Sequence, residues 1–129
     1  MNKILVEVSV GELLDKISIL EIKKVKIKDP AKLKFINDEH VILRGQLDNN
    51  VQSDDKLYEL FKSLKEINAK LWVIEDDKRM CEKNSDFTKK FIKLSRDVHF
   101  LNDERAKIKL KINNYTGSKI KEIKEYTSY

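Results

Sequence analysis

The chain has 129 residues, of which 38% are charged and 40% hydrophobic, with three glycines and one proline. So few turn-forming residues argue against a sandwich or barrel and predict an all-α fold of a few long helices. The length fits one domain over residues 1–129, and a single cysteine, Cys81, excludes an intramolecular disulfide.

The net charge raises the question of whether the chain binds nucleic acid. The formal net charge is +5, and clustered basic residues are typical of nucleic-acid-binding proteins. Here, however, Lys and Arg alternate with Asp and Glu, and only 4 of the 27 basic residues are arginines. We therefore expect a solvated surface and no nucleic-acid partner. No segment approaches the ~20 apolar residues of a membrane span, and no secretion signal is recognisable, so we expect a cytoplasmic protein.

The first expected element is a short β-strand within residues 1–9, because apolar residues occupy every second position of KILVEVSV. A helix should follow. Ser9 and Glu12 have the spacing of a capping box, which predicts a first helix from about residue 10 to 28.

The second expected helix begins at Asp29-Pro30, where a cap residue precedes a proline at the first helical position. Its apolar residues alternate at spacings of three and four and carry it to about residue 48. The first two helices therefore form a short hairpin over about 10–48. The polar loop NNVQSDD follows, with Ser53 as the next predicted cap.

The third and fourth expected helices span about 54–83 and 86–115. Each has ~30 residues and is therefore ~45 Å long. The NSDF junction is short and offers Ser85 as a cap, so these helices should fold back as an antiparallel hairpin, about 54–115, packed on the shorter one. Gly117 should end the last helix.

The C-terminal tail, residues 118–129, has two alternatives. It could supply the missing partner of the N-terminal strand, or it could run along the bundle.

Charged residues interrupt the apolar stripes of the long helices. At 100° per residue, Arg105 lies at the centre of the stripe of the fourth helix, with Asn102 and Lys109 on its flank. Glu75 lies at the centre of the third-helix stripe, four residues before Arg79. On the first helix, Glu21 also lies on the apolar side.

A buried charge costs several kcal/mol unless it is paired. In the predicted long hairpin, Arg105 lies beside Leu64 and near Asn68, without an acid at its level. We therefore expect its acid to come from the first helix, with Glu21 as first choice and Asp15 as second.

These inward residues have two interpretations. In the first, they fix register and helix pairing, as polar seam residues do in coiled coils. In the second, they line a cationic pocket in which Arg105, Lys109 and Arg79 bind an anion and Glu21 or Glu75 acts on it. The candidate ligand-binding residues are Glu21, Glu75, Arg79, Asn102, Arg105 and Lys109.

No catalytic residue, metal site or cofactor is predicted. His40 replaces an apolar residue of the second helix, but the spacings typical of metal ligands are absent, so a hydrogen-bonded structural histidine is expected. Glu12 and Asp15 have an i,i+3 spacing used by magnesium-dependent helical phosphohydrolases, but the second acidic pair is not recognisable. Phe100 points away from its stripe, so either the short hairpin or a second copy should cover it.

Four blocks carry a family resemblance: VSVGELLDKISILEIK, LWVIEDDKR, FIKLSRDVHFLNDERAKIKLKIN and GSKIKEIKEYTSY. They resemble an uncharacterised domain-of-unknown-function family of short bacterial and phage proteins. The resemblance implies an intracellular stand-alone protein, sometimes encoded near glycosyltransferase or sugar-nucleotide genes. It transfers no catalytic residue. The residues within the matching blocks include Glu12, Asp15, Glu21, Trp72, Glu75, Arg96, Asn102, Asp103 and Arg105.

The function expected from the sequence is that of a non-enzymatic helical accessory protein that acts through protein contacts, with self-association as a homodimer. The alternative is a small enzyme or binding protein for an anionic metabolite such as a sugar phosphate or nucleotide.

Overall fold

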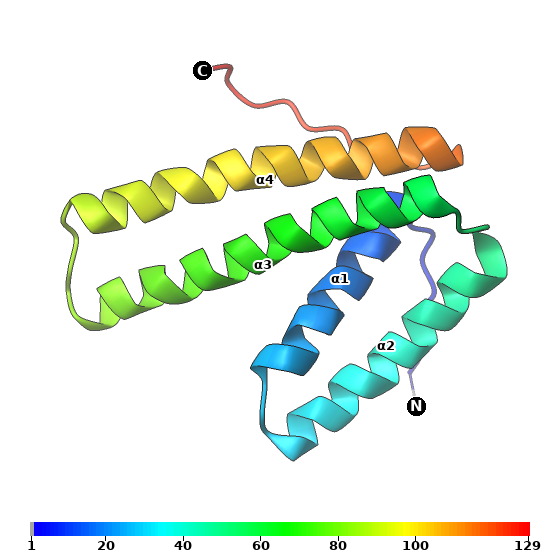
Figure 1. Cartoon of the computed structure of the whole chain (residues 1–129), viewed down its shortest axis with the longest axis horizontal. Coiled ribbons are helices and arrows are strands. Elements are labelled where there is room, and N and C mark those ends of the chain that lie inside the picture. The colour runs from blue at the N-terminus through cyan, green and yellow to red at the C-terminus, as the bar shows by residue number, and fades with distance from the viewer. Residues whose placement is uncertain (1) are drawn as a thin grey trace.

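A computed structural model describes residues 2–129 and contains four α-helices in chain order. They are α1 (Val10–Lys26), α2 (Pro30–Asn50), α3 (Asp55–Lys83) and α4 (Lys89–Thr116). Figure 1 shows α3 and α4 as a long antiparallel hairpin, with α1 and α2 as a shorter one against part of its length. The predicted all-α antiparallel bundle is therefore confirmed, and the largest boundary difference is at the start of α4, expected at residue 86.

Several predicted helix ends are confirmed. Ser9 accepts a hydrogen bond from the backbone N–H of Glu12 at 3.1 Å and caps α1. Asp29 caps α2 directly before Pro30. Gly117 ends α4 at a φ of 68°, a left-handed conformation that glycine adopts without a Cβ penalty.

Two predicted caps are wrong. Asp54, and not Ser53, caps α3, because its carboxylate accepts from the backbone N–H of Leu57 at 2.8 Å. Ser85 is part of the turn, at a φ of 52°, and α4 begins only after Thr88. The longer turn is held by Asp86, which accepts hydrogen bonds from both the backbone and the hydroxyl of Thr88.

The predicted N-terminal strand is also wrong. No strand is present within residues 2–129, and residues 2–9 run as an extended arm whose side chains up to Val8 are exposed. Met1, the first residue of the predicted strand, lies outside the described residues. A strand needs a paired edge, and the C-terminal tail does not supply one, because it runs along α4 (Figure 1). This settles the alternatives for the tail.

The helix α1 is the centre of the bundle. Its backbone lies close to those of α2, α3 and α4, whereas among the described helices the backbone of α2 lies close only to that of α1. The buried core joins residues of all four helices, namely Leu14, Ile17, Leu47, Leu57, Leu64 and Ile112. Because α1 alone touches every other helix, a polar side chain on its inner face can meet partners from both α3 and α4.

The outer part of the long hairpin, residues 72–101, has a different character, and we call it the distal hairpin. Within the described chain, Cys81 is the only buried residue of this segment. In Figure 1 neither α1 nor α2 lies against its tip. No helix within residues 2–129 is both long and apolar enough to span a bilayer.

Candidate functional site

The centre of the candidate site is Asp15 on α1, whose side chain is 2% exposed. Arg105 on α4 donates from Nε to Asp15 Oδ1 at 3.0 Å and from Nη2 to the other carboxylate oxygen. The two parallel bonds form the bidentate arrangement in which arginine binds a carboxylate most strongly. One acid of α1 therefore holds the central charge of the α4 stripe.

Asn68 on α3 completes the coordination of this acid. Its amide nitrogen donates to Asp15 Oδ1 and to Ser18 Oγ, both at 2.8 Å, so both amide hydrogens have acceptors. The Ser18 hydroxyl in turn donates to the backbone oxygen of Asp15 at 2.8 Å. Three helices, α1, α3 and α4, are thus joined around one buried carboxylate.

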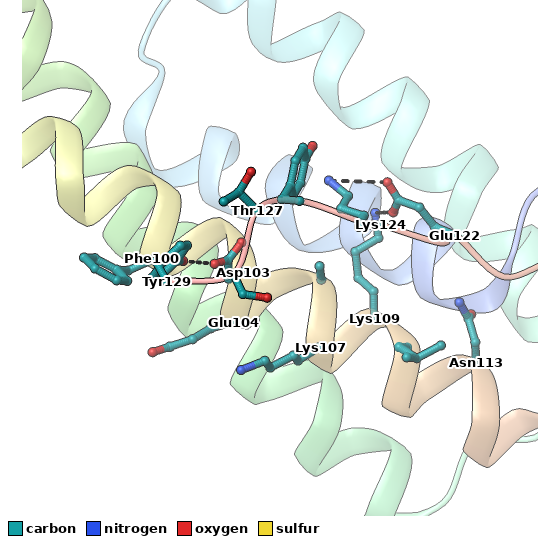
Figure 2. Close-up of a pocket in the computed structure, with 14 residues that line it drawn as sticks. Phe100, Asp103, Glu104, Lys107, Lys109, Asn113, Glu122, Lys124, Thr127 and Tyr129 are labelled. Carbon is teal, nitrogen blue, oxygen red and sulfur yellow. Dashed lines mark hydrogen bonds and ion pairs between the residues drawn. The ribbon is translucent and has the colours of Figure 1, made fainter.

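The second inward cation, Lys109, lies one turn further along α4. Its Nζ donates to Glu12 at 2.7 Å and to Glu122 at 2.9 Å, and lies 3.9 Å from Asp15 Oδ2. Figure 2 shows Lys109 extending from α4 toward Glu122 of the C-terminal tail. The tail therefore contributes an exposed acid to the edge of the bundle. We call Glu12, Asp15, Ser18, Asn68, Arg105, Lys109 and Glu122 together the Asp15 cluster.

The electrostatics of the Asp15 cluster favour the charged forms of its cations. Hydrogen bonding to Asp15 raises the pKa of Arg105 despite burial. Burial lowers the pKa of Lys109, but its hydrogen bonds to Glu12 and Glu122 outweigh that effect, and the net pKa is raised. The cluster holds three carboxylates against two cations. At its edge Lys16 and Lys124 also pair with Glu12 and Glu122, so the charges of the cluster are compensated within the chain.

The backbone of α1 also meets α4 directly, at Gly11. Its N–H donates to Asn113 Oδ1 at 2.7 Å, which satisfies a donor of the first helical turn. A Cβ on Gly11 would lie 2.6 Å from the backbone oxygen of Lys109. This close approach brings Glu12 and Asp15 within reach of α4.

Glu21, the first choice of acid for Arg105, is wrong, and Asp15, the second choice, is confirmed. Glu21 pairs with Lys65 on α3 at 2.9 Å and with His40 Nε2 on α2 at 3.3 Å. Burial raises the pKa of Glu21, but hydrogen bonds from Lys65 and His40 lower it by more, so the net pKa is lowered. The physical reason is the slant of α1, whose C-terminal end runs away from α4 (Figure 1). Glu21 therefore pairs with residues of α2 and α3.

His40 is a hydrogen-bonded structural histidine, as expected. Its Nδ1 lies 2.9 Å from Lys24 Nζ. Because an ammonium group can only donate, Nδ1 accepts and Nε2 carries the proton that is shared with Glu21. Within residues 2–129, no group of three or more His, Cys, Asp or Glu side chains is placed to hold a metal ion.

Comparison with known protein families shows the family of the chain. Residues 4–129 match the model of a family of unknown function, DUF6165. The chain belongs to this family. The resemblance inferred from the sequence blocks is thus confirmed at the level of a family without an assigned function. No curated protein and no solved structure matches the chain.

The remaining candidate residues of this DUF6165 member lie at the edge of the site. Glu75 and Arg79 pair with each other at 2.9 Å, and their side chains are 42% and 74% exposed, so the prediction of an inward Arg79 is wrong. Asn102 Oδ1 is 3.5 Å from Arg105 Nη1, a long contact. Glu75 and Arg79 border an open pocket of about 440 Å³ beside the Asp15 cluster. Its lining residues are Ile19, Asn68, Leu71, Trp72, Glu75, Asp76, Arg79 and Arg105.

Sequence reasoning missed four contributors, namely Gly11, Ser18, Asn113 and Glu122. Asn113 had a usable signal, because it follows Lys109 by four residues and Arg105 by eight and therefore shares their side of α4. Gly11 had a weaker one, since a glycine in a helix is costly and suggests close packing. Glu122 had none, because its position depends on where the tail runs.

Proposed function

We propose that this protein is a non-enzymatic helical interaction protein that acts through contacts with other proteins. The observation that carries the proposal is the internal compensation of the inward charges. Arg105 and Lys109, the two cations that could have bound a substrate, both donate to carboxylates of the same chain. A catalytic or anion-binding site needs groups that are free to change partners, whereas these groups fix helix positions.

The surface supports the same proposal. Large apolar side chains are exposed on elements that make few internal contacts, among them Phe35 on α2 at 76% and Phe87 at 53%. Apolar surface beyond a few hundred Å² is uncommon on monomers and marks interaction sites. The distal hairpin and α2 therefore provide surface for partners, while the interior provides none for a reaction.

A thermal-shift screen with nucleotides, sugar nucleotides and phosphosugars tests this function. A ligand at ~100 times its dissociation constant adds about 2.7 kcal/mol to the free energy of unfolding. The proposal expects no compound to raise the melting temperature. A dose-dependent rise with any of them would contradict it and favour a metabolite-binding role.

One observation favours that second role, a binding protein for a small anion. Among residues 2–129, Arg105 Nη1 has only the 3.5 Å contact to Asn102. The Arg105 side chain is 30% exposed and lines the pocket beside Trp72 and Arg79. A ring packed on Trp72 with an anionic group near Arg105 would use the free edge of the guanidinium. Glu75 and Asp76 line the same pocket and offset the positive charge, which is why we rank this role second.

The variant Arg79→Gln separates the two roles. Arg79 is exposed, and its hydrogen bonds within the described chain go only to Glu75, so its removal leaves the Asp15 cluster intact. If the pocket binds an anion, a thermal shift seen with the wild type should shrink in Arg79→Gln. A shift of equal size in both proteins would exclude this pocket as its source.

A further inference from the structure

The N-terminal arm, which we define as residues 2–8, is an exposed segment before the start of α1. Its apolar side chains are exposed by 85%, 80%, 73% and 43% at Ile4, Leu5, Val6 and Val8. Within the described chain, no residue of the arm takes part in a hydrogen bond or an ion pair. The backbone N–H and C=O groups of the arm are therefore open to a pairing strand, as they are on the edge of a sheet.

Most of the other exposed apolar side chains lie on helices. Phe100 on α4 is one of them: the predicted cover by the short hairpin is wrong, and Tyr129 of the C-terminal tail packs edge-on against its ring at 5.3 Å. Backbone groups inside a helix are already paired with each other, so a helical surface binds a partner through side chains alone. The N-terminal arm offers a backbone edge as well, and such an edge selects a β-strand as its partner.

The arm has the side-chain alternation of a strand with two different faces. In an extended chain, one face carries the β-branched residues Ile4, Val6 and Val8, which are favoured in strands. The opposite face carries Lys3, Leu5 and Glu7. This second face therefore has one base and one acid, placed two residues before and two residues after its central leucine.

This placement of charge is complementary to itself. When two arms pair antiparallel and centred on Leu5, Lys3 of each copy lies directly opposite Glu7 of the other. Opposite charges in directly facing positions stabilise a strand pair. A shift of one residue in either direction places Lys3 opposite a valine, and a parallel pairing in register places Lys3 beside Lys3. The centred antiparallel register is therefore the one in which both charges of each arm are paired.

We propose that the N-terminal arm pairs with the same arm of a second copy of the chain, as an antiparallel two-stranded ribbon centred on Leu5. The proposal rests on the proposed function and names its partner. No strand is present within residues 2–129 of a single chain, so the arm becomes a strand only in the dimer. The pairing is isologous, because a two-fold axis at Leu5 makes every contact occur twice. Two strands alone are marginally stable, so the association is reversible and depends on concentration.

Disulfide trapping of the intact chain tests the register. In the ribbon the two Leu5 Cα atoms lie about 4.5–5.5 Å apart, within reach of a disulfide, so Leu5→Cys should form a covalent dimer of twice 15.2 kDa under mild oxidation. The matched control is Ile4→Cys, at a similarly exposed position. The two Ile4 positions are diagonal neighbours about 7–8 Å apart, too far for a disulfide, so cross-linking should be about tenfold slower than for Leu5→Cys. The native Cys81 is buried and common to both variants.

A charge exchange in the Leu5→Cys background tests the partner. Lys3→Glu and Glu7→Lys each place like charges opposite one another at both ends of the ribbon and should slow cross-linking by about tenfold. The double variant restores both pairs and should recover the original rate. Circular dichroism verifies that each variant keeps its helix content. Equal rates for Leu5→Cys and Ile4→Cys, no slowing by the single charge changes, or no recovery in the double variant overturns the inference. None of these outcomes bears on the ligand screen, which tests the proposed function separately.

Discussion

Asp15 on α1 and Arg105 on α4, ninety positions apart in the chain, are joined by two parallel hydrogen bonds inside the bundle. The acid is nearly inaccessible and the guanidinium is 30% exposed. Three more polar groups, from Asn68, Ser18 and Lys109, lie around them. The stripe of α4 can therefore hold an arginine at its centre because α1 brings the matching carboxylate.

The first prediction concerns Asp15→Asn. The change leaves Arg105 and Lys109 with less compensation, and removing one partner of a buried ion pair costs about 3 kcal/mol or more. Urea unfolding should show this loss. Glu21→Gln is the control, because Glu21 pairs with the half-exposed Lys65 and its loss should cost only about 1 kcal/mol. An equal loss of unfolding free energy in the two variants would show that Asp15 is no more important to the fold than Glu21.

The second prediction compares two glycines. A methyl group on Gly11 would lie 2.6 Å from the backbone oxygen of Lys109 and 2.9 Å from Asn113 Oδ1, so Gly11→Ala should lower the free energy of unfolding by about 1–3 kcal/mol. Gly45 lies within α2 with no atom within 4 Å of such a group. Gly45→Ala should therefore raise stability by about 0.4–1 kcal/mol. Effects of the same sign at both positions would show that helix propensity, and not close packing, dominates.

The four helices were predictable because local signals agree: the caps at Ser9 and Asp29, the stop at Gly117 and the apolar periodicity all favour the same elements. The charged residues were predictable only as a class. Helical angle identified Arg105 and Lys109 as inward, but the crossing of α1, which decides between Asp15 and Glu21, is a tertiary property. The N-terminal strand was predicted wrongly for a related reason, since the alternating pattern of these residues says nothing about whether a partner strand exists.

The third prediction concerns acid. The pKa of Glu21 and the pKa of Glu122 are both lowered in the folded protein, chiefly by lysine hydrogen bonds that overcome burial. A carboxylate with a lowered folded pKa stabilises the fold above its ordinary pKa, and this contribution is lost as the pH falls through the folded value. Lys109, with a raised pKa, keeps its contribution until the pH rises through that value. Stability should therefore be flat near neutrality and fall on acidification.

Urea unfolding at a series of pH values measures this profile. Glu21→Gln should flatten its acidic side, because one titrating group is removed while the helices remain. An acidic side of unchanged slope would show that other carboxylates account for the pH dependence.

The fourth prediction concerns the tail. Removing residues 119–129 deletes Glu122 and Tyr129 but leaves Lys109 paired with Glu12 at 2.7 Å. Because the deleted residues are all exposed, the loss of stability should be about 1 kcal/mol or less. Glu122→Gln should reproduce most of it. A truncated chain that no longer unfolds cooperatively would give the tail a larger structural role than its contacts indicate.

The most direct test of the central claim is a double-mutant cycle of Asp15→Asn and Arg105→Met, followed by urea unfolding. If the inward charges compensate each other inside the bundle, each single change should be costly and the double change should cost much less than their sum, with a coupling energy of about 2 kcal/mol or more. Additive losses, within about 0.5 kcal/mol, would contradict the claim that this pair locks the fold.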